Sequence, residues 1–189
     1  MLKPKFVSCI FLLTALTASA AAVAADPVAG KARAAVCQGC HGADGVSALA
    51  KTPSLAGQPA AYLEAQLQKF KSGLRKNPTM QAMVSELSNS DIENLAAFFA
   101  ALPAKSAGGD PQLASAGKAK TAMCVSCHGE NLGGHGEHPR LAGQRADYLV
   151  EQLQKFKQRE RQGGPMNAIA QLQSADDINA LAAYLAGLN

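Results

Sequence analysis

The 189-residue sequence lacks several patterns that define common protein classes. No segment alternates polar and apolar residues for long enough to indicate a β-sheet. Beyond the N-terminus, no apolar run is long enough to cross a membrane. The net charge is only +4, and it falls to +2 if an N-terminal leader carrying Lys3 and Lys5 is removed, so no strong field favours nucleic acid. These absences favour a helical protein with neither a transmembrane span nor a nucleic-acid surface.

Residues 1–25 have the pattern of a cleaved secretory signal peptide. Two lysines make its start positive, an apolar run follows over residues 6–16, and small residues end the segment at Ala25. Cys9 lies inside this segment without the pattern of a lipid anchor. A retained N-terminal anchor is the alternative. We therefore predict an exported chain whose mature part is residues 26–189.

Cysteine is scarce, and the four cysteines outside the leader fall into two identical patterns. These are Cys37-Gln-Gly-Cys40-His41 and Cys124-Val-Ser-Cys127-His128. Each is the signature of covalent c-type haem attachment, in which two thiols bond to the haem and the next imidazole binds the iron. Disulfides and a zinc site are the alternatives, but neither explains a histidine directly after both pairs. We therefore predict two covalently bound haem c groups.

The chain is a tandem duplication. Residues 53–71 return as residues 139–157, and the offset of 86 continues to the C-terminus. Two copies of this size are two small domains, each of which buries little surface without a cofactor. We predict an N-terminal domain over 26–104, a linker over 105–110 and a C-terminal domain over 111–189. The glycines and serine near the linker indicate little structure there, and an ordered strap is the alternative.

Both copies are predicted to be all-α. Apolar residues at helical spacing indicate amphipathic helices, and Ser-x-x-Asp patterns indicate the start of the last helix in each copy. The expected helices cover residues 30–36 and 117–123, then 59–71 and 145–157, and finally the segments that begin near Ser88 and Ser174. Gly30 and Gly117 are expected to let the first helix cross closely over the last.

The histidine of each motif is the predicted proximal ligand of the iron. A proximal imidazole needs an acceptor for its second nitrogen, which holds the tautomer and the ring orientation. Pro53 lies 12 residues after His41, and Pro139 lies 11 residues after His128. The carbonyl groups of these two prolines are the expected acceptors.

The repeat also indicates the second axial ligand of each iron. Met80 and Met166 match at the offset of 86, whereas Met83 matches Ile169 and is expected to fill the core. A thioether is a soft ligand that favours ferrous iron. We therefore predict His41 and Met80 on one iron and His128 and Met166 on the other.

Other polar residues leave alternatives open. His135 and His138 occur only in the second copy, where they are either replacement ligands or exposed loop residues. Matched tyrosines and glutamines have two interpretations as well, because they either bond to haem propionates or serve helix-start packing. The matched residues are Gln58, Tyr62, Gln144 and Tyr148.

In this order, the motifs resemble those of the class I cytochrome c family and, more closely, of its dihaem cytochrome c4 type. Each copy has Cys-x-x-Cys-His, then Pro-x-Leu-x-Gly at residues 53–57 or 139–143, then a methionine before the last helix. The resemblance covers essentially all of residues 26–189. It implies two tandem class I cytochrome c domains, each around one covalently bound haem c.

The resemblance also implies a function, which is to carry single electrons in the periplasm without catalysis of its own. The implied partners are a quinol–cytochrome c oxidoreductase or another donor, and a terminal oxidase or reductase as acceptor. Peripheral association with the membrane is left open. One alternative is a haem subunit of a larger dehydrogenase, such as a flavocytochrome c sulfide dehydrogenase. A dihaem peroxidase needs an open iron site, and matched methionines in both copies argue against it.

Overall fold

The computed structural model describes residues 24–189, and this part of the chain is helical. It contains no strand, only an isolated bridge between His135 and His138. None of its helices is long and apolar enough to cross a membrane. The predicted all-α fold is confirmed. The predicted signal peptide lies almost entirely outside the described residues and stays a prediction.

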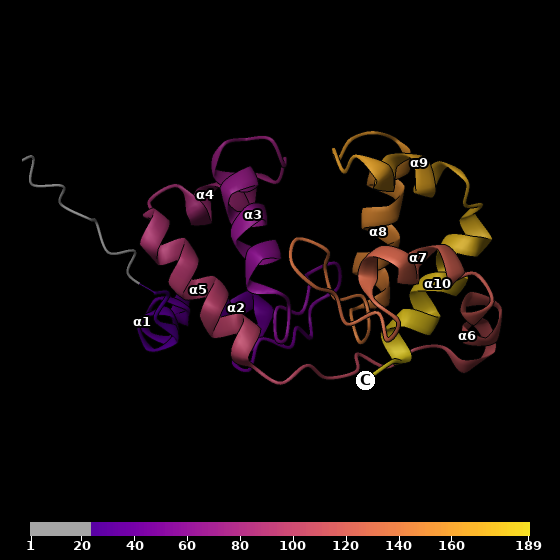
Figure 1. Ribbon diagram of the computed structural model, residues 1–189, viewed down its shortest axis with the longest axis horizontal. Helices are drawn as coiled ribbons and strands as arrows, with labels where there is room; N and C mark the ends of the chain where they lie inside the picture. Colours follow the sequence, from indigo (N-terminus) through magenta and orange to yellow (C-terminus); the bar gives the residue numbers. More distant parts are fainter. Residues whose placement is uncertain (1–23) are drawn as a thin grey trace, which may run out of the picture.

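The two copies repeat one order of helices. The first copy contains α1 (Pro27–Arg33), α2 (Ala35–His41), α3 (Ala60–Lys71), α4 (Pro78–Val84) and α5 (Asn89–Ala101). The second contains α6 (Pro111–Lys118), α7 (Ala122–His128), α8 (Ala146–Lys157), α9 (Pro165–Gln171) and α10 (Ala175–Gly187). Figure 1 shows the copies side by side, with the joining segment along one edge. We call residues 26–104 the first copy and residues 111–189 the second copy.

The helix starts follow the sequence signals closely. At the start of α5 the hydroxyl of Ser88 accepts from the N–H of Asp91, and the carboxylate of Asp91 accepts from the N–H of Ser88. Ser174 and Asp177 make the same two bonds at the start of α10, so both predicted capping boxes are present. The predicted first helix is wrong in one respect, because it is divided at Ala34 into α1 and α2. Helices α4 and α9, which carry Met80 and Met166, were not predicted. Each begins with a proline, which suits the first position of a helix.

A glycine lies where the first helix of each copy crosses the last. A Cβ atom on Gly30 would lie 2.0 Å from the carbonyl oxygen of Asn94 in α5. A Cβ atom on Gly117 would lie equally close, 2.0 Å, to the carbonyl oxygen of Ala180 in α10. No side chain fits at either crossing, and the predicted close approach is confirmed.

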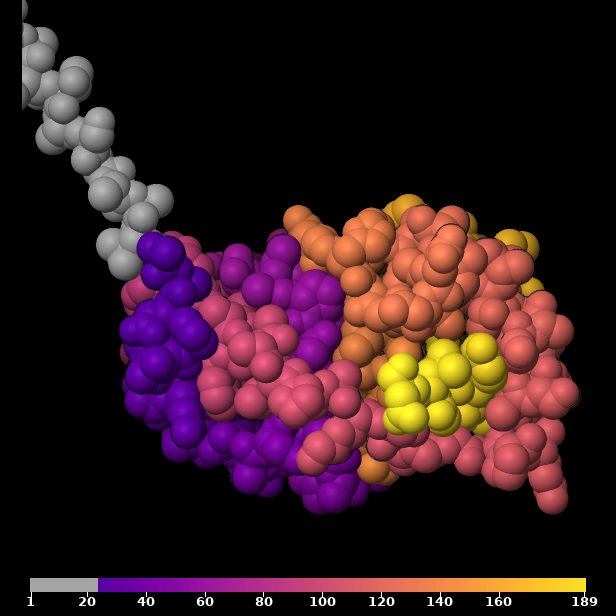
Figure 2. Space-filling view, turned by 60° about the horizontal axis from the view of Figure 1, so that its bottom comes forward, coloured from indigo at the N-terminus to yellow at the C-terminus, as the bar shows by residue number. Residues whose placement is uncertain are grey.

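The segment that joins the copies is ordered by contacts with both of them. Lys105 forms an ion pair with Asp44 of the first copy. The hydroxyl of Ser106 and the backbone N–H of Ala107 both donate to the carbonyl oxygen of Ala186, at 3.0 and 3.1 Å. Figure 2 shows the yellow C-terminal residues beside this segment on the surface. The segment has no helix or strand, as expected, but its contacts make it an ordered strap, which was the alternative interpretation.

Two glutamines hold the copies together through backbone groups. Gln58 of the first copy accepts from the N–H of Arg140 at 3.0 Å and donates to its carbonyl oxygen at 2.8 Å. Gln144 of the second copy does the same with Ser54, at 2.8 and 2.9 Å. Because the two pairs occupy matched positions, the contact has pseudo-twofold symmetry.

A second pair of contacts follows the same symmetry. The guanidinium of Arg75 donates to the hydroxyl of Tyr148 at 2.9 Å and to the side-chain oxygen of Gln152 at 3.0 Å, both across the interface. The matched bonds in the opposite direction join Arg161 to Tyr62 and Gln66. Each arginine also lies over a phenylalanine ring of its own copy, Phe70 or Phe156, at 4.5 Å. The interface therefore contains polar contacts in matched pairs, one contact of each pair from each copy.

Candidate functional site

The two motif histidines end helices α2 and α7, and both are buried. His41 is 7% exposed and His128 is 5% exposed. The Nδ1 atom of His41 lies 2.9 Å from the carbonyl oxygen of Pro53, and that of His128 lies 2.8 Å from the carbonyl oxygen of Pro139. A carbonyl can only accept, so Nδ1 carries the proton and Nε2 keeps a free lone pair. The predicted proline acceptors are confirmed.

Burial also favours the form of each histidine that can bind a metal. It lowers the pKa of His41, although the carbonyl of Pro53 opposes that shift. Burial likewise lowers the pKa of His128, and Pro139 again opposes it. Both rings are therefore neutral near pH 7, which is the state that iron ligation requires.

The thiols of the motifs lie on the same short helices as the histidines. All four are free, and burial raises the pKa of Cys37 and of Cys124. Cys37 packs against the first hydrophobic core, and Cys124 packs against the second. Within residues 24–189, no group of three or more His, Cys, Asp or Glu side chains is arranged to hold a metal ion. The arrangement presents, in each copy, two thiols and one free imidazole nitrogen beside an apolar core.

The two methionines of α4 differ in their surroundings. Met80 is half-buried and packs against the first core, as Cys37 does. Met83 is 42% exposed, so the expectation that it fills the core is wrong. In the second copy Met166 is half-buried near the start of α9. Ligation of iron by Met80 and Met166 stays a prediction.

The other polar residues singled out in the sequence lie either in an exposed loop of the second copy or at the interface between the copies. His135 and His138 are exposed in a loop, with ring centres 5.3 Å apart, and the ring of His138 lies 6.1 Å from that of His128. This agrees with exposed loop residues. Gln58, Gln144 and the matched tyrosines bond across the interface, a role that neither interpretation of the sequence included.

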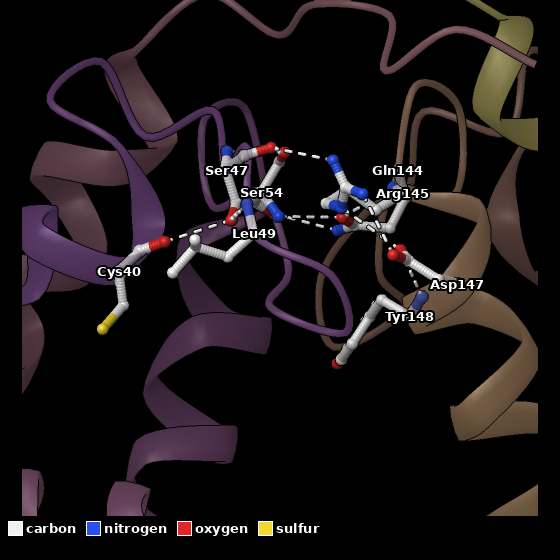
Figure 3. Close-up of polar contacts among 8 residues, drawn as sticks. All are labelled: Cys40, Ser47, Leu49, Ser54, Gln144, Arg145, Asp147 and Tyr148. Carbon is white, nitrogen blue, oxygen red and sulfur yellow. Dashed lines mark hydrogen bonds and ion pairs between the residues drawn. The ribbon is translucent and has the colours of Figure 1, made fainter.

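A chain of hydrogen bonds connects the first motif to the second copy, as Figure 3 shows. The hydroxyl of Ser47 donates to the carbonyl oxygen of Cys40 at 3.0 Å, and the N–H of Ser47 donates to the hydroxyl of Ser54 at 3.2 Å. The backbone of Ser54 then pairs with Gln144. The surroundings of the first motif are thus continuous with the interface.

The comparisons with known proteins agree with this geometry. The family model described as Cytochrome c matches residues 28–103 and 114–189. The chain is 37% identical to cytochrome c4 of Azotobacter vinelandii over 94% of this chain and 96% of that protein. It is 38% identical to a thiosulfate dehydrogenase electron acceptor of Stutzerimonas stutzeri, over 80% and 78%. The crystal structure of reduced recombinant cytochrome c4 from Pseudomonas stutzeri superposes with a TM-score of 0.82 at 35% identity, covering 88% of this chain and all of that one.

The chain belongs to the cytochrome c family. Membership of the family, twice in tandem, implies haem c in each copy. The fold of two tandem cytochrome c domains and the likeness to cytochrome c4 are therefore confirmed.

The residues present fit such a group. Each copy offers paired thiols, a neutral imidazole and apolar side chains, as described above. Arg140 adds a buried donor, because it is 5% exposed and its Nε atom has no hydrogen-bond partner among residues 24–189. A propionate carboxylate of a haem could accept a hydrogen bond from this Nε–H group. Neither pattern analysis nor the repeat indicated Arg140, since its counterpart in the first copy is Ser54.

Proposed function

We propose that this protein is a periplasmic dihaem electron carrier that transfers single electrons between redox proteins and has no catalytic reaction of its own. The observation that carries the proposal is the repeated geometry of the motif histidine. In both copies it is buried, neutral and held by a proline carbonyl, directly beside two thiols. The fold of each copy thus holds one nitrogen ligand for iron beside two thiols that can bond to a haem.

The proposed attachment and ligand sets follow the duplication. Cys37 and Cys40 hold the first haem, and Cys124 and Cys127 hold the second. His41 with Met80, and His128 with Met166, are the proposed axial ligands. When bound, haem c supplies reversible one-electron chemistry at iron. With these pairs in place, the chain would supply two side-chain ligands to each iron, and a substrate would have to displace one of them.

The arrangement of the copies suits a carrier. The polar contacts of the interface fix the copies in one orientation, and the strap adds bonds to both. These contacts keep the two cofactor sites at one separation, so the transfer of an electron between them would not depend on domain motion. We also propose the domain limits predicted above, 26–104 and 111–189, with the strap between them.

The proposed partners are redox proteins, with a quinol–cytochrome c oxidoreductase or another donor on one side and a terminal oxidase or reductase as acceptor on the other. The identity of 38% to a thiosulfate dehydrogenase electron acceptor favours a second version of the same function, in which a dehydrogenase supplies the electrons. A stable haem subunit of a larger dehydrogenase is the alternative. Purification from the periplasm distinguishes them, because a carrier separates from its partner and a subunit does not.

The count of covalent haems tests the proposal directly. The denatured mature protein should have the mass of residues 26–189 plus about two haem groups, one for each pair of thiols. The double substitution Cys37→Ala and Cys40→Ala should leave one haem. Gln38→Ala is the matched control, because it changes the same motif without removing a thiol, and it should leave two haems. A wild-type protein with one haem or none would refute the proposal.

Coordination by two protein ligands has its own test. The fully reduced protein should bind almost no carbon monoxide at neutral pH and should be oxidised rapidly by a suitable oxidase. Stoichiometric binding of carbon monoxide, together with rapid turnover of peroxide, would place the protein among the enzymes instead.

A further inference from the structure

One peptide group in each copy is hydrogen-bonded on both sides. In the first copy, the carbonyl of Pro53 accepts from Nδ1 of His41 at 2.9 Å. The N–H of the same peptide group, which belongs to Ser54, donates to the side-chain oxygen of Gln144 at 2.8 Å. The peptide group thus lies between the histidine of one copy and a glutamine of the other.

The second copy repeats this arrangement with the roles of the copies exchanged. The carbonyl of Pro139 accepts from Nδ1 of His128 at 2.8 Å. The N–H of that peptide group belongs to Arg140 and donates to the side-chain oxygen of Gln58 at 3.0 Å. The same geometry therefore occurs at the matched position of each copy.

The glutamines are held firmly and are shielded from water. Gln58 is 3% exposed and Gln144 is 2% exposed. The amide nitrogen of each also donates to the carbonyl oxygen of the residue that it accepts from, Arg140 or Ser54. This second bond determines which end of the amide is the oxygen, because a carbonyl can only accept. Hydrogen bonds of this kind are strengthened by the low local dielectric.

Hydrogen bonds in series polarise one another through the peptide group. A bond from the N–H increases the negative charge on the carbonyl oxygen, so the carbonyl attracts the Nδ1 proton of the histidine more strongly. A histidine whose second nitrogen donates to a stronger acceptor is a more basic metal ligand. A more basic ligand stabilises ferric iron relative to ferrous iron and so lowers the reduction potential.

We propose that each glutamine is a positioning residue for the histidine of the other copy, so that Gln144 tunes the iron bound by His41 and Gln58 tunes the iron bound by His128. This inference rests on the proposed dihaem function. It predicts a crossed dependence, in which a substitution in one copy changes the haem of the other.

The test is a spectroelectrochemical titration of the intact dihaem protein, with each wave assigned to its copy through the NMR signals of the haem methyl groups. Gln144→Ala should raise the reduction equilibrium constant of the first-copy haem about three- to tenfold, where tenfold corresponds to about 59 mV. The second-copy haem should change by less than about twofold. Gln58→Ala should give the reverse pattern. In the ferrous protein, the Nδ1 proton of the affected histidine should move upfield.

Gln66→Ala is the matched control for a looser interface. Gln66 accepts from Arg75 of its own copy at 2.9 Å and from Arg161 of the other copy at 3.0 Å, but it does not bond to either proline loop. Its substitution should change the reduction equilibrium constant of each haem by less than about twofold. Equal shifts of both haems in all three variants would show that the glutamines only hold the copies together, and would overturn the inference.

Two further outcomes keep the result unambiguous. If Gln144→Ala does not mature, Gln144→Met carries the test, because methionine keeps the length of the side chain but has no amide oxygen to accept from the N–H of Ser54. The first-copy potential should again rise, and the Nδ1 proton of His41 should again move upfield. An unchanged Nδ1 proton in that variant would overturn the inference. Haem content measured by mass separates this failure from failure of the proposed function, which would appear as fewer than two haems in the wild-type protein.

Discussion

The crossing of α6 over α10 allows a sharp prediction about a single methyl group. In Gly117→Ala, the new Cβ atom would lie 2.0 Å from the carbonyl oxygen of Ala180, whereas real Cβ atoms stay beyond 3.0 Å. The neighbour is backbone, so no side chain can move aside. The two helices must separate by about 1 Å, which loosens every contact along the crossing.

The size of the effect follows from the packing. Overpacking of a tight contact costs about 1–3 kcal/mol, and contact with rigid backbone falls at the upper end of that range. Alanine regains about 0.5–1 kcal/mol in helical propensity over glycine. We therefore expect Gly117→Ala to lower the free energy of unfolding by about 2 kcal/mol. Gly30→Ala should do the same, because its Cβ would meet the carbonyl oxygen of Asn94 at the same distance.

Gly39→Ala is the matched control, and its effect should have the opposite sign. Gly39 lies inside α2, has no atom within 4 Å of the position of a Cβ, and is replaced by Ser126 in the second copy. Alanine there should stabilise the protein by about 0.5 kcal/mol. Guanidinium titrations followed by circular dichroism, with haem content checked by mass, measure all three variants. If Gly117→Ala unfolds at the same denaturant concentration as Gly39→Ala, the crossing is not as close as described.

Three other predictions concern charge and ligation. Met80→Ala should remove the sulfur–iron charge-transfer absorption of one ferric haem, whereas the exposed Met83→Ala should leave it; the reverse result would refute the proposed ligand. The ammonium of Lys120 lowers the pKa of Asp177 to about 2. This carboxylate should therefore stabilise the fold above the ordinary pKa of about 3.9 and lose that effect as the pH falls towards 2, and Asp177→Asn should remove that part of the acid unfolding curve. Arg140→Gln removes a buried cation and should lower one reduction potential in a redox titration, whereas unchanged potentials would show that no propionate pairs with it.

Local features of the structure were largely predictable from the sequence. The capping boxes at Ser88 and Ser174, the amphipathic helices and the close glycine crossings all depend on residues near one another in the chain or on the repeat. The proline acceptors were predictable for a different reason. An imidazole that binds a metal needs an acceptor on its other nitrogen, and the same proline follows the motif in both copies.

Contacts between the copies were not predictable, because they join residues about 70 to 100 positions apart. The repeat showed that Gln58 and Gln144 match, but it could not show that each bonds to the backbone of the other copy. Backbone partners leave no trace in side-chain patterns. The expectation for Met83 was wrong because it relied on the match with Ile169, and a match between copies does not show which face of α4 is covered.

Because the glutamines bond to backbone groups, the interface can be symmetric while the side chains near the two cofactor sites differ. Across the interface, each glutamine bonds to the N–H and the carbonyl of residue 54 or 140, so these bonds leave the side chain there free to differ. It is Ser54 in the first copy, bonded within its own loop, and Arg140 in the second, with a free buried donor. Duplication supplies the same backbone contacts to both copies, but the side chain at this position introduces a charge into the second copy alone. The guanidinium of Arg140 also donates across the interface, to the carbonyl oxygen of Ala56 at 2.8 Å. Because a nearby cation favours ferrous over ferric iron, the two haems should differ in potential even though their proposed ligands are of the same kinds.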